Sequence, residues 1–117
     1  MSMRRYNFLV IIFCLVITLG SSIPGTSIPE LDIFGIDKLL HVLEYFIFGY
    51  LLVNSFSDKT QYPVYLSFFL GICFALIDET YQLTVIGRSS SAFDVIADAI
   101  GLTLAIIFNH RFSKILG

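Results

Sequence analysis

Four runs of apolar residues follow one another along the chain, and short polar stretches separate them. A helix needs roughly 20 mostly apolar residues to cross a bilayer. The pattern therefore predicts four membrane-spanning helices, at about residues 6–22, 37–56, 62–83 and 92–109. Because the intervening stretches are short, we expect an all-α, integral membrane four-helix bundle that forms a single domain over residues 1–117.

The residues at the ends of these runs support the predicted boundaries. Pro24 and Pro29 precede the second run, and neither can continue a helix. Pro63 suits the first turn of the third helix, where its missing N–H is not needed. Ser91 and Asp94 have the spacing of a capping box, with aspartate in place of glutamate. The first run is short enough to resemble a signal-peptide core as well, and we favour an uncleaved span.

The composition fits a bundle surrounded by lipid. Of the 117 residues, 56% are hydrophobic and only 14% are charged, whereas soluble domains carry about 25% charged residues. We therefore expect membrane lipids as the immediate partners. No basic stripe is present, so we expect no nucleic-acid partner. Cys14 and Cys73 lie in apolar runs without the spacing of a disulfide framework or a thiolate metal site, and we interpret them as small hydrophobic residues.

The basic residues predict the orientation in the membrane. With four spans, two of the seven, Lys38 and Arg88, fall on one side. The other five lie on the opposite side: Arg4, Arg5, Lys59, Arg111 and Lys114. Positive charge is concentrated in cytoplasmic loops. We therefore predict a multi-pass protein of the inner (plasma) membrane with both termini in the cytoplasm.

Acidic residues gather on the predicted outer side, several of them inside helices. On the second predicted helix, Asp37, His41 and Glu44 are spaced at i, i+4 and i+7 and share one face. An ionisable group inside a span costs on the order of 2.5–3.5 kcal/mol, so it normally faces the bundle interior or a watery cavity. Tyr45 follows directly and could donate a hydrogen bond at a similar depth.

The third and fourth predicted helices repeat this arrangement. Asp78 and Gln82 are one turn apart near the end of the third helix, with Glu79 beside them. Asp94 and Asp98 are one turn apart at the start of the fourth helix. On the same stripe of the fourth helix, Gly101 would let another helix approach closely. Three helices thus each bring polar groups to the outer end of the bundle.

Arg88 lies in the loop between the third and fourth predicted helices. Its guanidinium can hold two carboxylate oxygens at once, so it either staples these helices together or completes a polar pocket for an anionic or glycosidic group. His41 with several carboxylates could hold a divalent metal. The cluster has only one histidine and no HExxH spacing, however, so we predict neither a metal nor a cofactor.

Residues 37–101 resemble the VanZ-like proteins. The first motif is Asp37-Lys38-Leu39-Leu40-His41 followed by Glu44-Tyr45. The second comprises Asp78-Glu79-Thr80-Tyr81-Gln82, Gly87-Arg88, Asp94-Val95-Ile96-Ala97-Asp98 and Gly101. The chain has Ile86 where the family commonly has proline, and Asp98 where asparagine is common. Glu44 enters our candidate site from helical spacing, not from the resemblance.

The resemblance implies a bacterial membrane protein of a family whose name-giving member is associated with resistance to teicoplanin, a lipid-tailed glycopeptide antibiotic. We favour a non-enzymatic protein whose outward polar pocket engages a lipid-linked cell-wall intermediate or a lipoglycopeptide. The alternative is a membrane-embedded enzyme that acts on a lipid or wall precursor, with His41 as acid or base beside Glu44. A small carrier and a purely structural cluster also stay open. The candidate binding residues are Asp37, Lys38, His41, Glu44, Tyr45, Asp78, Glu79, Gln82, Arg88, Asp94 and Asp98.

Overall fold

The computed structural model describes residues 3–22, 34–87 and 91–116, with side chains described over residues 5–22, 38–87 and 91–111. These residues form four helices and no strand: α1 (Met3–Ser21), α2 (Phe34–Phe56), α3 (Pro63–Gln82) and α4 (Ala92–Leu116). The predicted all-α architecture is confirmed. The largest difference from the predicted bounds is the later end of α4, and α1 and α2 each begin three residues earlier than predicted.

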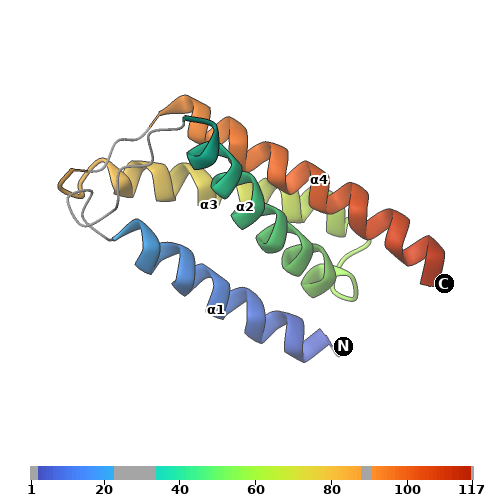
Figure 1. The fold of residues 1–117 in the computed structure, drawn as a ribbon. Coiled ribbons are helices and arrows are strands. Elements are labelled where there is room, and N and C mark those ends of the chain that lie inside the picture. Colours follow the sequence, from blue (N-terminus) through green and yellow to red (C-terminus); the bar gives the residue numbers. More distant parts are fainter. Residues whose placement is uncertain (1–2, 23–33, 88–90, 117) are drawn as a thin grey trace.

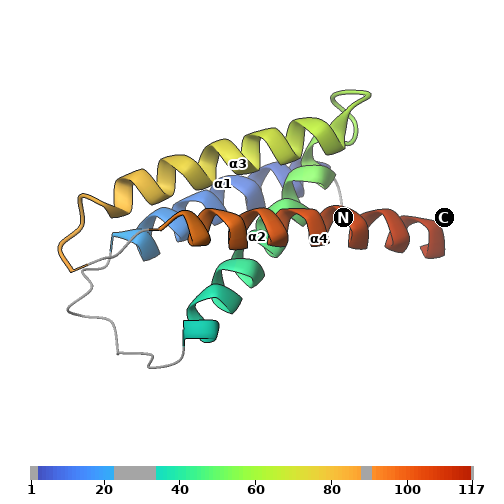
Figure 2. The same cartoon turned by 90° about the horizontal axis from the view of Figure 1, so that it is seen from above.

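The four helices run alternately up and down, so that the end of α1, the start of α2, the end of α3 and the start of α4 lie at one end of the bundle (Figures 1 and 2). We call this the cluster end, because the polar residues of the candidate site lie there. Helix α2 packs against each of the other three, most extensively against α4. It is therefore the central element of the fold.

Glycine explains the close packing of α2 and α4. A Cβ atom at Gly101 would overlap the carbonyl oxygen of Val42 and would lie 2.9 Å from the backbone nitrogen of Phe46. The two helices thus touch backbone to backbone, as the sequence predicts for Gly101. Further along, a Cβ at Gly49 would lie 3.0 Å from the Cβ of Ala105. Small residues on both helices therefore set their separation.

The interior is filled by aromatic and branched side chains. Phe48 on α2 lies at its centre, with ring centroids 6.2 Å from Phe13 of α1 and 5.2 Å from Phe74 of α3. Tyr45 packs edge-on against the same ring at 5.7 Å. Because the ring of Phe48 on α2 contacts rings on both α1 and α3, this core joins these two helices to the α2–α4 pair.

Three helices are long and apolar enough to cross a membrane: Lys38–Phe56, Pro63–Gln82 and Ala92–Arg111. Helix α1 is apolar over Arg5–Ser21 but shorter. Large hydrophobic side chains such as Ile77, at 66% exposure, cover the outside of the bundle. This is the surface expected of helices whose solvent is lipid.

Candidate functional site

Charged side chains from α2, α3 and α4 meet at the cluster end. We define the polar cluster as Lys38, His41, Glu79, Asp94 and Asp98. Asp98 lies six residues after the first residue of α4, or about 9 Å along the helix. Glu79 lies about one turn before the end of α3. The cluster is therefore sunk into the bundle, below the helix ends.

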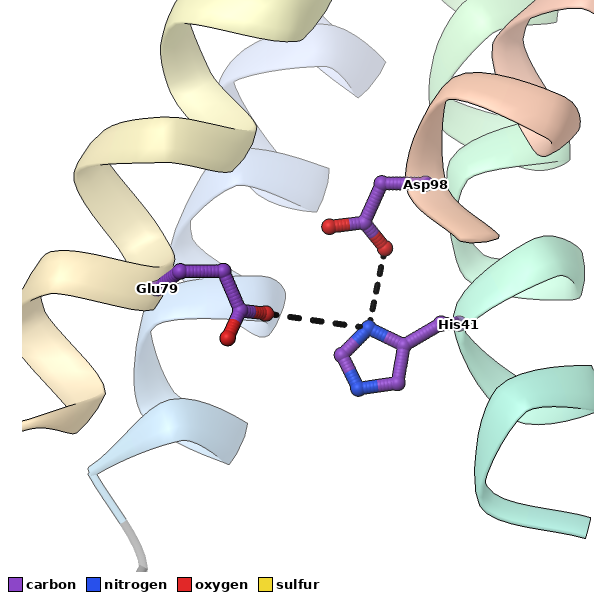
Figure 3. A group of neighbouring side chains, drawn as sticks. All are labelled: His41, Glu79 and Asp98. Carbon is purple, nitrogen blue, oxygen red and sulfur yellow. Dashed lines mark hydrogen bonds and ion pairs between the residues drawn. The ribbon is translucent and has the colours of Figure 1, made fainter. Parts of the chain in front are cut away.

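His41 is the hub of this cluster. Its Nδ1 lies 2.9 Å from Asp98 Oδ1, within hydrogen-bond distance, and 3.9 Å from Glu79 Oε1 (Figure 3). Its Nε2 lies 3.8 Å from Asp94 Oδ1. The histidine side chain keeps 13% of its surface exposed, while Asp98 has none. One imidazole on α2 thus faces carboxylates from both α3 and α4.

Asp94 ties the start of α4 to α2. The ammonium group of Lys38 donates a hydrogen bond to Asp94 Oδ1, forming an ion pair. The other carboxylate oxygen, Oδ2, accepts the backbone N–H of Ser91 at 3.3 Å. This is the reach-back half of the predicted capping box. The aspartate therefore caps its own helix and neutralises a lysine at the same time.

Asp98 Oδ2 and the hydroxyl oxygen of Tyr45 are both buried in this region without a hydrogen-bond partner among the described residues. Tyr45 is completely buried and belongs to the hydrophobic core. The hydrogen bond that we expected this tyrosine to donate is absent from the described part of the chain. A buried polar atom left unpaired is costly, so the open oxygen of Asp98 calls for an explanation.

A second polar network lies on the other side of α3. Ser21 at the end of α1 donates a hydrogen bond of 2.5 Å to Asp78, and the amide of Gln82 donates to Ser21 at 3.1 Å. Consecutive helical residues point about 100° apart, so Asp78 faces α1 while Glu79 faces α2 and α4. Ser21 is not among the site residues that the sequence predicts. Only the tertiary structure shows that Ser21 is buried beside the carboxylate of Asp78.

A pocket of about 260 Å³ opens between the end of α3 and the start of α4. Its lining includes Glu79 and Thr80 from α3 and Ser91 from the start of α4. Glu79 therefore belongs both to the polar cluster and to the wall of a cavity. A molecule in this pocket would reach the cluster through that carboxylate.

The described side chains at the cluster end carry more negative than positive groups. Lys38 and His41 face the carboxylates of Glu79, Asp94 and Asp98, and the carboxylate of Asp78 lies near that of Asp98. A site of this kind accepts hydrogen bonds from hydroxyl or ammonium groups. The chemistry of these residues therefore favours the hydroxyl groups of sugars, and cations.

The remaining predicted residues fall around or outside this cluster. Glu44 is half-buried on α2, in the turn after His41. Asp37 lies in α2, but its side chain is outside the described part of the chain, and Arg88 is outside the described residues altogether. Lys38, His41, Glu79, Asp94 and Asp98 are brought together, whereas Asp78 and Gln82 belong to the network with α1.

Comparison with known proteins agrees with this arrangement of motifs. A family model, VanZ/LLP1, matches residues 2–113, which is nearly the whole chain. No curated protein and no solved structure matches the chain significantly.

Proposed function

Because the chain belongs to the VanZ/LLP1 family of membrane proteins, we propose that its cluster end binds the sugar part of an amphiphile at the outer face of the plasma membrane. The ligand class is a lipid-linked cell-wall intermediate or a lipoglycopeptide. The observation that carries this proposal is the group of buried carboxylates from two apolar helices, α3 and α4, beside a pocket that reaches Glu79. Carboxylates accept hydrogen bonds from sugar hydroxyls, and the apolar flank of the bundle accommodates the lipid tail.

The charge distribution supports an outward-facing site. Lys59 lies in the turn between α2 and α3, at the end of the bundle opposite the cluster. Arg4 and Arg5 lie in the first turn of α1, at that same end. Since basic residues are retained in the cytoplasm, this proposal places both termini inside. The cluster end then meets the side of the plasma membrane on which wall precursors are displayed.

The first test is protection of a susceptible bacterial host. We expect the wild-type chain to raise resistance to teicoplanin but not to vancomycin, since only the former carries a lipid tail. Glu79→Gln removes a carboxylate that lines the pocket and is expected to abolish protection, as is Arg88→Ala. Asp58→Asn, an exposed change in the turn between α2 and α3, is the matched control and is expected to protect fully at equal membrane levels.

Direct binding separates the ligand proposal from the resistance phenotype. Purified protein in nanodiscs is titrated with a lipid-linked disaccharide precursor and, separately, with a phospholipid of the same chain length. Selective, Glu79-dependent binding of the glycolipid supports the proposal. Equal binding of both lipids, together with no protection of cells, would reject it.

The alternative function as a membrane-embedded enzyme has one specific observation in its favour. The imidazole of His41 is held at 2.9 Å by the fully buried carboxylate of Asp98, an arrangement that orients a general acid or base. In this arrangement the orienting carboxylate comes from α4, whereas the sequence suggested Glu44 on α2, the helix of His41 itself. A His41→Gln variant that keeps full cellular activity while folded would eliminate this reading.

A further inference from the structure

We propose that His41, Glu79 and Asp98 bind a first-row divalent transition-metal ion, for which Zn²⁺ is the probe. This inference goes beyond the proposed function and does not depend on it. The three residues each offer a ligand atom, and these atoms all lie within 4.8 Å of one another (Figure 3). They come from α2, α3 and α4, so the ion would be bound where the three helices meet.

The distances fit coordination after a small adjustment. Zinc binds histidine nitrogen and carboxylate oxygen at about 2.1 Å, so two tetrahedral ligands lie about 3.4 Å apart. The separations from His41 Nδ1 are 2.9 Å to Asp98 Oδ1 and 3.9 Å to Glu79 Oε1. Both of these separations need to change by about 0.5 Å, and the third, between the carboxylate oxygens of Glu79 and Asp98, is no more than 4.8 Å.

The open oxygen of Asp98 is independent evidence for a ligand. This side chain is fully buried, yet its Oδ2 has no hydrogen-bond partner in the part of the chain that the structure describes. In Figure 3 one oxygen of Asp98 faces His41 while the other is directed toward the side of Glu79. A metal ion bound between these side chains would satisfy the second oxygen as well as the first.

Charge balance favours a divalent cation. Lys38 already neutralises Asp94 through its ion pair. The fully buried carboxylate of Asp98 lies in a site with little exposure to water, where a buried charge needs compensation. A divalent cation bound there with neutral imidazole would supply positive charge beside it. Imidazole with carboxylates suits zinc and related ions better than the hard cation Mg²⁺.

The surroundings resemble those of a metal site with an open position. Metal-binding histidines usually direct their second ring nitrogen at a carboxylate or carbonyl, and His41 Nε2 lies 3.8 Å from Asp94 Oδ1. With Asp98 bound through both oxygens, the three side chains supply four donor atoms, and zinc can accept a fifth ligand at the open position. The pocket lined by Glu79 gives a water molecule or a ligand oxygen access to that position.

The test measures zinc on the full chain in detergent. The protein is stripped with a chelator, equilibrated with ZnCl₂, freed of excess ion and assayed by mass spectrometry and titration calorimetry. We expect about one zinc per folded chain and a zinc-dependent rise in unfolding temperature. Asp98→Asn keeps the shape of the side chain and is expected to weaken zinc binding at least tenfold. Mg²⁺ is expected to produce no such rise.

Asp78→Asn is the matched control, because Asp78 is a buried carboxylate at the same end that bonds to Ser21 instead of joining the trio. It is expected to bind zinc as the wild type does. Glu79→Gln provides a second ligand variant should Asp98→Asn fail to fold. A folded wild-type chain that retains no zinc and shows no thermal shift would overturn the proposal. So would undiminished zinc binding by folded Asp98→Asn and Glu79→Gln, since the ion would then lie elsewhere.

Discussion

Gly101→Ala tests the close contact of α2 and α4 on which the polar cluster depends. The new methyl group would overlap the carbonyl oxygen of Val42 and would lie 2.9 Å from the nitrogen of Phe46 and 3.1 Å from the Cβ of Tyr45. Two of these neighbours are backbone atoms of α2, which cannot rotate away. To restore ordinary van der Waals contact, α4 must therefore move away by on the order of 1 Å.

The expected cost follows from two opposing terms. Overpacking of this kind costs about 1–3 kcal/mol, and the clash of Gly101→Ala with backbone places it at the upper end. Alanine is a better helix former than glycine by up to about 1 kcal/mol. The net loss is about 2 kcal/mol, or roughly a 30-fold change in the unfolding equilibrium. Since Asp98 lies one turn before Gly101, the same shift separates it from His41.

Gly20→Ala is the control for this prediction. A Cβ at Gly20 meets nothing within 4 Å, so the substitution is expected to be neutral or slightly stabilising. The assay is unfolding of detergent-solubilised protein by SDS titration, with reaction of the partly buried Cys14 and Cys73 as a second probe. Equal stability of the two variants would refute the backbone contact between α2 and α4.

Two further substitutions test the polar contacts, each by the same titration. Ser21→Ala removes the hydroxyl that donates to Asp78 and accepts from Gln82, and the loss of these two buried hydrogen bonds is expected to cost about 1–3 kcal/mol. A loss no larger than that of an exposed serine change would argue against this network. Lys38→Met leaves Asp94 buried without its cation. Breaking a buried pair costs about 3–5 kcal/mol, and the 22% exposure of the lysine side chain reduces the expected loss to about 1–3 kcal/mol. If Lys38→Met costs the same in an Asp94→Asn background, the pair is not coupled.

The sequence was sufficient for the helices themselves. Length and hydrophobicity of a run are local properties, and they located all four helices within a few residues at most ends. The later end of α4 at Leu116 was missed because its last turns carry polar residues, which a search for apolar runs does not include. Gly101 was also recognised in advance, since a small residue in an apolar helix marks a close approach.

Which residues meet was decided by the tertiary structure. Lipid and bundle interior are both apolar, so no hydrophobic stripe tells which face of a helix turns inward. Helical spacing therefore suggested Glu44 as a neighbour of His41, but it could not show that Asp98 lies at 2.9 Å from this histidine. Helical spacing likewise could not show that Asp78 faces α1 while Glu79 faces α2 and α4. This difference depends on the rotation of α3 about its axis. Packing against α1 on one side and the α2–α4 pair on the other determines that rotation.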